Sequence, residues 1–446
     1  MNSKQSCLFI IFILSLSSLC GCKVSTTSSA PRVEPHVASS QSTVSSQLAV
    51  EKETIRFLED RVKKDPEDFI ACNKLAQQYL QRLRETGDLT YLNLATKAAH
   101  ASLATLPPEQ NVGGLTASAQ VEYASHDFAA ARDHALKLIQ LEPKKGYTYQ
   151  ILGDALLELG DYEQAAAAYR TMEDLSGIQG LTRSAIEQRL ARVAALHGDV
   201  SGARQHLRNA LTLALDLPEP PAETVAWCRW QLGEAAFAVG DYAGAEQQYR
   251  TALEDYPEYF RALASLGKAR AAQGDIKGGI EELERAVRII PDPTFVATLG
   301  DLYKADGRDK DAAAQYELVE RIGHISELNG ALYNRQLALF YADHDIKSNR
   351  AYENASREYA IRKDIYGADA LAWAALKNNK VAEAQSLISS ALRLGTKDVR
   401  LFYHAGMIAR AAGDSKQGRE YLQQALTLNP QFDPLQATIA RKALAE

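Results

Sequence analysis

Small and large apolar residues recur in a fixed order along most of this 446-residue chain, around a turn that returns at regular intervals. Before a typical turn stands the pair Leu152-Gly153, and after it come a small residue, Ala165, and a large one, Tyr169. Alanine is abundant and runs of β-branched residues are scarce, which favours helix over strand. The pattern predicts an all-α protein built from pairs of helices.

The turn itself is Gly-Asp in most of its copies. Counted from residue 126, successive turns are separated by 34, 38, 42, 34, 33, 38, 34 and 34 residues. Glycine ends the first helix of a pair because it tolerates the left-handed conformation, and proline ends several of the second helices. A single helical pair cannot cover its own apolar face, so the copies are expected to stack on one another.

A basic period of 34 residues with small insertions resembles the tetratricopeptide repeat family. The resemblance implies an α-solenoid, a right-handed superhelix of about ten helical hairpins, which begin near residues 68, 112, 146, 184, 226, 260, 293, 331, 365 and 399. We expect a capping helix at 51–67, repeats 1–4 at 68–217, repeats 5–10 at 218–430 and a second capping helix at 431–446. The proline-rich loop Pro218–Pro221 is expected to be a flexible joint.

The start of the chain predicts export. Lys4 precedes an apolar run, Leu8–Leu14, which is too short to span a bilayer but suits a signal peptide over residues 1–21. The run leads to Leu19-Cys20-Gly21-Cys22, which resembles the lipobox of bacterial lipoproteins. The resemblance implies that the Cys22 thiol is acylated after residues 1–21 are removed; an ordinary secretory signal is the alternative.

Residues 22–50 are rich in serine and threonine and show no apolar periodicity, which predicts a disordered tether between the lipid and the repeats. Lys23 follows the cysteine where an aspartate would favour retention. The family's sorting logic therefore implies a bacterial envelope location, at the outer membrane and facing the periplasm. Cys72 and Cys228 remain as thiols, and both are expected to be buried.

By the same resemblance, the first helices of the hairpins line a concave groove that binds partners. The residues expected to face it are Tyr147 and Leu157 in the third repeat, Trp227, Trp230, Glu234 and Phe237 in the fifth, and Tyr366, Trp373 and Tyr403 in the last two. Exposed tryptophan and tyrosine often anchor partners. The alternative is that these aromatics complete the packing between repeats.

The remaining chemistry narrows the function classes. A formal net charge of −6 without a basic block is unsuited to nucleic acid. The sequence contains no HExxH, GxSxG, GxGxxG or phosphate-loop motif, so it predicts no catalytic residue, metal or cofactor. The hypothesis is a non-enzymatic, membrane-tethered adaptor that binds one or more envelope proteins or peptides during envelope assembly or secretion. The alternative is a module that binds cell-wall glycan or exported polysaccharide through the aromatic stripe.

Overall fold

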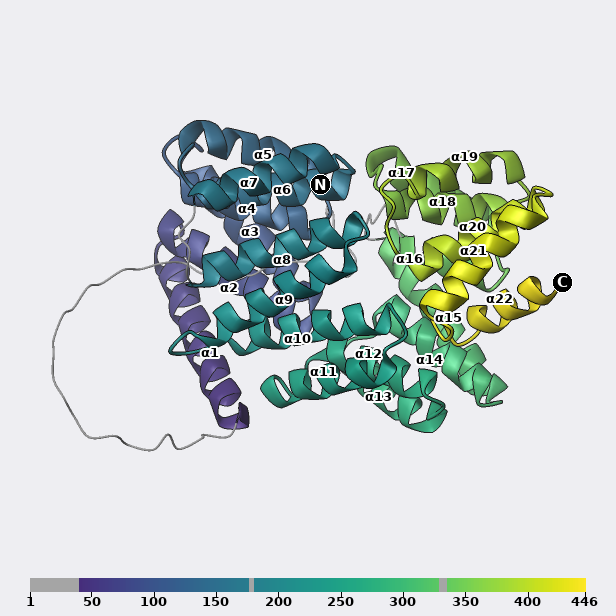
Figure 1. Cartoon of the computed structure of the whole chain (residues 1–446). Helices are drawn as coiled ribbons and strands as arrows, with labels where there is room; N and C mark the ends of the chain where they lie inside the picture. The colour runs from purple at the N-terminus through teal and green to yellow at the C-terminus, as the bar shows by residue number, and fades with distance from the viewer. Residues whose placement is uncertain (1–39, 176–179, 329–334) are drawn as a thin grey trace.

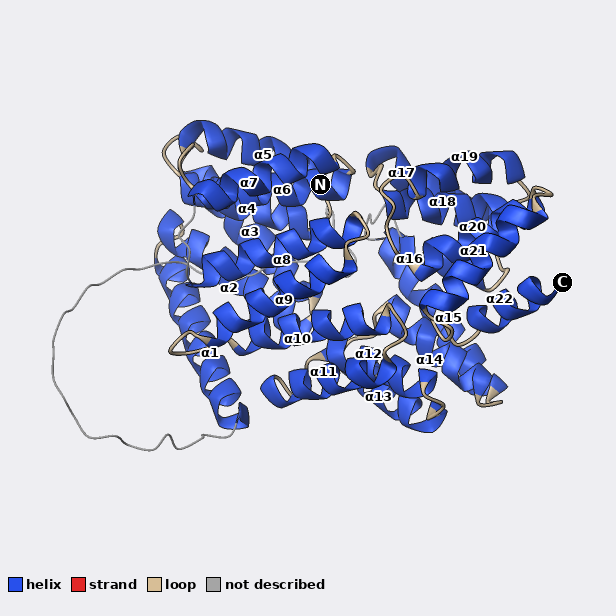
Figure 2. Ribbon diagram, in the orientation of Figure 1, coloured by secondary structure: helices blue, strands red, loops and turns tan. Residues whose placement is uncertain are grey.

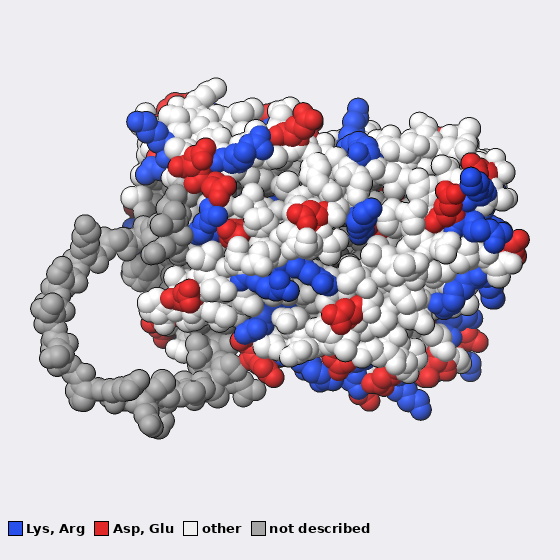
Figure 3. Space-filling model, viewed as in Figure 1, with Lys and Arg blue, Asp and Glu red and all other residues white. Residues whose placement is uncertain are grey.

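A computed structural model describes residues 40–175, 180–328 and 335–446, and these residues form twenty-two helices and no strand (Figures 1 and 2). The predicted all-α solenoid is confirmed. On the face shown in Figure 3, acidic and basic side chains are interspersed. Among the described helices, none combines the length and the apolar character that crossing a membrane requires.

Ten hairpins make up the solenoid within these residues, as the sequence period predicts. Helix α1 (Ser40–Lys64) precedes them and α22 (Gln436–Ala445) follows them. The hairpins are α2 (Phe69–Thr86) with α3 (Leu89–Thr105), α4 (Val112–Ala124) with α5 (Phe128–Leu141), α6 (Gly146–Leu159) with α7 (Tyr162–Leu175), α8 (Gly180–Leu196) with α9 (Val200–Leu215), α10 (Ala222–Phe237) with α11 (Tyr242–Asp255), α12 (Phe260–Ala272) with α13 (Ile276–Ile289), α14 (Pro293–Ala305) with α15 (Asp309–Leu328), α16 (Arg335–Asp343) with α17 (Ser348–Ile361), α18 (Ile365–Lys377) with α19 (Val381–Ala391), and α20 (Val399–Ala411) with α21 (Ser415–Leu428).

The two residues of the Gly-Asp turn have different structural roles. Gly240 follows α10 with φ of 78°, in the left-handed region that glycine adopts at little cost. Asp241 then caps α11, because its carboxylate accepts a 3.0 Å hydrogen bond from the backbone N–H of Gly244. In two weaker copies of the turn, His126 and Asn379 adopt the same left-handed conformation without being glycine, at φ of 64° and 58°.

The small and large positions fit each other within a hairpin. A Cβ atom added to Gly233 would lie 2.3 Å from Cε1 of Tyr249, so only glycine leaves room for that ring. The hydroxyl of Tyr249 then donates a 2.6 Å hydrogen bond to the carboxylate of Glu234. The same arrangement recurs in two other hairpins, formed by Gly153, Asp154 and Tyr169 and by Gly300, Asp301 and Tyr316.

The superhelix is tightly coiled. A hairpin contacts a loop five hairpins further along the chain. The turn of the fifth hairpin shows this: the Tyr242 hydroxyl donates a 2.6 Å hydrogen bond to Asn429, whose amide donates one of 2.7 Å to the carbonyl of Phe237. Thr396 bonds the carbonyl of Leu196 in the same way, between hairpins four and nine. Figure 1 accordingly shows α5–α9 beside α16–α19.

Helix α1 bridges the first and fifth hairpins. Its amino-terminal half reaches the proline-rich loop, where Gln47 donates to the carbonyl of Pro220 at 3.1 Å and accepts from the N–H of Ala222 at 3.3 Å. Val44 and Leu48 pack in the same apolar cluster as Trp227. The loop predicted to be a flexible joint is therefore held by α1.

The start of α1 corrects the predicted tether. Disorder was expected throughout residues 22–50, but the helix begins at Ser40. Residues 40–50 are helical because Val44 and Leu48 extend the apolar stripe of Ile55, Leu58 and Val62 and bury it against other hairpins. The signal peptide, Cys22 and the tether as far as residue 39 lie outside the described residues.

Candidate functional site

The aromatic residues of the fifth hairpin, predicted to face an open groove, are buried. Trp227, Trp230 and Phe237 expose only 6%, 8% and 8% of their surface. The indole N–H of Trp230 donates a 3.0 Å hydrogen bond to Ser265 on α12. Because the side chains fill the space between neighbouring first helices, they are core residues and offer no ring face to a ligand.

The last two hairpins repeat this result for two of their three predicted aromatics. Trp373 is fully buried, stacks on His404 with ring centroids 4.3 Å apart, and donates from its indole N–H to Asp343 at 2.8 Å. Tyr403 is 1% exposed and its hydroxyl donates to Gln436 at 2.8 Å. Only Tyr366, at 36%, is substantially exposed.

The other three predicted residues also serve packing. Leu157 is 2% exposed. The half-buried Tyr147 packs beside the cluster of Leu115 and Leu138, and its hydroxyl bonds Glu142. Glu234 is the acceptor for Tyr249 described above. The prediction of an open aromatic groove is therefore wrong for the buried residues, and it leaves sugar stacking without a surface there.

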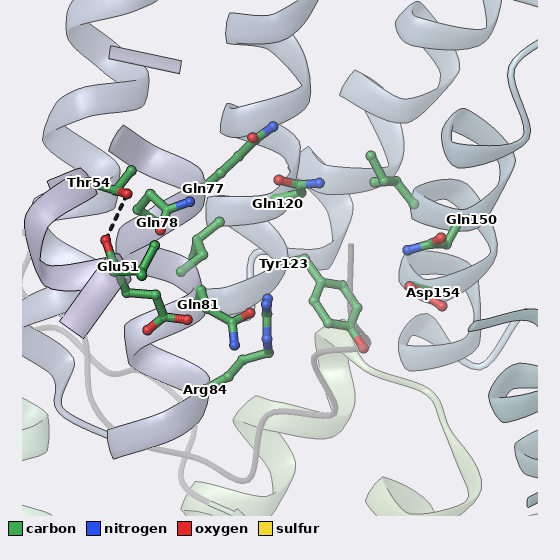
Figure 4. Close-up of a pocket in the computed structure, with 13 residues that line it drawn as sticks. Glu51, Thr54, Gln77, Gln78, Gln81, Arg84, Gln120, Tyr123, Gln150 and Asp154 are labelled. Carbon is green, nitrogen blue, oxygen red and sulfur yellow. Dashed lines mark hydrogen bonds between the residues drawn. The ribbon is translucent and has the colours of Figure 1, made fainter. Parts of the chain in front are cut away.

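A cavity of about 330 Å³ instead lies farther towards the amino terminus, between α1, α2, α4 and α6 (Figure 4). Three apolar residues, Val50, Leu80 and Ile151, form part of its wall. Most of the rest is amide, contributed by the glutamines Gln77, Gln78, Gln81, Gln120 and Gln150. The volume falls at the lower end of the range of about 300–1,000 Å³ for ligand pockets.

Three polar atoms of this wall are buried without a hydrogen-bond partner in the described part of the chain. They are Oε2 of Glu51, Nε of Arg84 and Nε2 of Gln120. Burying such an atom costs about 1–3 kcal/mol unless something bonds it. Their concentration around one cavity marks a place where a ligand would be stabilised.

Arg84 is the most unusual of the three. Its side chain extends into the cavity between Gln81 and Tyr123 and is 7% exposed (Figure 4). No ion-pair partner for its guanidinium lies among the described residues, and burial lowers its pKa. Arginine keeps its charge even when its pKa is lowered, so the cavity contains a cation without a direct counter-ion.

The two carboxyl groups of the cavity wall, Glu51 and Asp154, differ in their surroundings. Burial, followed by the charge of nearby Glu85, raises the pKa of Glu51 to about 7. Asp154 is fully engaged, because its two oxygens accept hydrogen bonds of 2.9 and 2.5 Å from Arg189. Thus Glu51 is close to half protonated at neutral pH, whereas Asp154 is occupied by a structural ion pair.

Sequence reasoning missed this site because it searched for aromatics. Glutamines stand on three consecutive first helices, including Gln77, Gln120 and Gln150, and this recurrence is the signal that was available. The buried thiols were predicted correctly, since Cys72 and Cys228 are both buried and free. In the described ranges, no cluster of three His, Cys, Asp or Glu side chains could hold a metal.

Comparison with known proteins agrees with the repeat pattern. One tetratricopeptide repeat family model matches residues 116–177, 231–293 and 370–431, and a second matches 182–258. The chain is a tetratricopeptide repeat protein. Proteins built from tetratricopeptide repeats generally mediate contacts between proteins, and neither matching model describes an enzyme.

Two relatives show the extent of the similarity. The TPR repeat-containing protein YpiA of Bacillus subtilis is 24% identical over 320 residues, covering 71% of this chain and 63% of YpiA. Human Tetratricopeptide repeat protein 36 is 34% identical over 120 residues, covering 24% of this chain and 63% of that protein. The chain thus spans less than two thirds of the length of either relative.

Solved structures with similar repeats include BtubC from P. vanneervenii, at 21% identity, 46% coverage of this chain, 91% of that chain and a TM-score of 0.38. Cut9-Hcn1 of the APC/C hetero-tetramer is 12% identical, with 92% coverage of this chain, 95% of that chain and a TM-score of 0.33. The family assignment rests on the repeat sequence and not on these superpositions.

Proposed function

We propose that this tetratricopeptide repeat protein is a non-enzymatic scaffold, tethered to a bacterial membrane through acylated Cys22, that holds a segment of a partner protein in the cavity between α1, α2, α4 and α6. The cavity carries the proposal. Here the first helices α2, α4 and α6 line open space with five glutamine amides, and the Nε of Arg84 and the Nε2 of Gln120 have no hydrogen-bond partner among the described residues.

The cavity suits a short stretch of polypeptide better than a folded surface. Its volume of about 330 Å³ is too small to admit a helix with its side chains. Glutamine amides both donate and accept, so they match the alternating N–H and C=O groups of an extended backbone. The partner would be one or more envelope proteins, and the place of action the outer membrane, facing the periplasm.

Photo-crosslinking tests the binding site. A crosslinking residue at Gln120, in the cavity wall, should give a discrete protein adduct in cells. The matched control is Gln385, exposed on α19, which should give none. Equal labelling from both positions, or an adduct from position 385 alone, would contradict the cavity as the binding site.

The anchor has a separate test. The substitution Cys22→Ser should abolish labelling by a fatty-acid analogue and move the protein from the membrane to the soluble fraction. The matched control is Cys72→Ser, at a buried thiol, which should leave labelling unchanged. Labelling that persists in Cys22→Ser would refute the anchor without affecting the scaffold.

A further inference from the structure

We infer that Arg84 binds a carboxylate of the partner segment, so that the cavity selects short extended peptides bearing one acidic group. This inference rests on the proposed function and names the class of ligand for the same cavity. Arg84 is more than nine-tenths buried, its Nε has no hydrogen-bond partner in the part of the chain that the structure describes, and its side chain extends into the cavity.

The backbone around Arg84 is held in place by a hydrogen bond and by the close packing of the turn that follows. It lies in the last turn of α2, and its backbone carbonyl accepts a 3.4 Å hydrogen bond from Arg261 on α12. The turn that follows is closed against the sixth hairpin, where a Cβ on Gly87 would lie 2.3 Å from Ile290. A guanidinium on a backbone held in this way needs little reorganisation to receive a ligand.

The charges around Arg84 favour a ligand that carries a single negative charge. Arg84 interacts electrostatically with Glu51 on α1, Glu85 on α2, and Glu223 and Arg261 on α10 and α12. Arg82 is paired with Glu85, and its Nη1 also lies 3.6 Å from Oε2 of Glu51. Because burial raises the pKa of both Glu51 and Glu223, the three arginines outweigh the ionised carboxylates around them, so one ligand carboxylate restores the balance. A phosphate dianion would exceed the single negative charge that this balance needs.

The amides determine how the rest of the ligand lies. Helices α2, α4 and α6 contact one another in sequence, at about 8–10 Å per step. Gln81, Gln120 and Gln150 therefore offer amides across two steps, while Arg84 stands beside Gln81 (Figure 4). An extended chain with its carboxylate at Arg84 would run from α2 towards α6.

The test uses the full chain and three pools of random hexapeptides made from uncharged residues. The first pool has a free terminal carboxylate, the second is amidated with one internal aspartate, and the third is amidated without an acid. Retention on the protein is measured by size exclusion and mass spectrometry. At least one acidic pool should be retained about 10-fold or more over the neutral pool. Preference between the two acidic pools tells a chain terminus from a side chain.

Variants decide whether Arg84 causes the preference. Arg84→Gln should reduce it to about one, while Arg321→Gln, at an exposed arginine on α15, should leave it intact. If Arg84→Gln does not fold, Arg84→Lys keeps the charge and should keep part of the preference.

Equal retention of all pools, retention of none, or a preference unchanged in Arg84→Gln would overturn the inference. So would capture of uronic-acid oligosaccharides, offered separately to the same protein, in place of peptides. The Gln120 adduct in cells would still stand in these cases, which separates this failure from that of the proposed function.

Discussion

The backbone N–H of Ile365 donates a 2.8 Å hydrogen bond to the hydroxyl of Tyr162, which lies 203 residues earlier in the chain. Tyr162 begins the second helix of the third hairpin, and Ile365 begins the ninth. The contact closes one turn of the superhelix, so its strength can be measured separately from the packing of neighbouring hairpins.

Removing the Tyr162 hydroxyl should destabilise the folded chain. Tyr162→Phe leaves the buried N–H of Ile365 without its partner, which should lower the free energy of unfolding by about 1–3 kcal/mol in chemical denaturation. The control is Tyr149→Phe, whose hydroxyl donates to the carbonyl of Pro143 at an exposed position. Similar losses in the two variants would mean that the closure contact contributes nothing special.

Substitutions at two turn glycines can separate the cost of backbone strain from the cost of breaking the contact between distant hairpins. Gly160 has φ of 89°, and a Cβ there would lie 2.5 Å from the carbonyl oxygen of Lys363. Gly413 has φ of 87° with nothing within 4 Å of such a Cβ. Both changes to alanine should cost about 1–2 kcal/mol of backbone strain, but Gly160→Ala should cost about 1–3 kcal/mol more, because the hairpins must move apart. Thermal denaturation of both variants would show the difference, and equal costs would contradict closure at this turn.

The buried aromatics should behave as core residues. Trp373→Ala should lower the free energy of unfolding by about 3–5 kcal/mol, because it leaves a large cavity. Tyr366→Ala, at a side chain 36% exposed on the same helix, should cost about 1 kcal/mol or less. A Trp373 variant as stable as the native chain would restore this residue as a candidate for partner contact.

Glu51 should make stability depend on pH. Its pKa rises from 4.5 to about 7 in the folded chain, so the folded state binds more protons than the unfolded state between these values. Stability should therefore fall as pH rises from about 4.5 through about 7, by up to about 3 kcal/mol. Glu51→Gln should remove this fall and be the more stable protein at pH 8. Parallel pH profiles for the two proteins would refute the shift.

Much of the fold was predictable because its determinants are local. The pair Gly240-Asp241 ends one helix and caps the next through contacts within a few residues, and Gly233 makes room for Tyr249 inside the same hairpin. The candidate site was not predictable in this way. Trp230 occupies an expected groove position, yet its exposure depends on Tyr259 and Ser265 in the next hairpin.

The number of hairpins, their order and their turns follow from local sequence, since a period of 34 residues repeats the same short-range contacts. The tertiary structure decided how tightly the hairpins coil, because small rotations at each interface add up along the solenoid. That coiling brings Tyr162 to Ile365, seats Gln47 against Pro220 and buries the tryptophans. It leaves the glutamines and Arg84 around the cavity between α1, α2, α4 and α6.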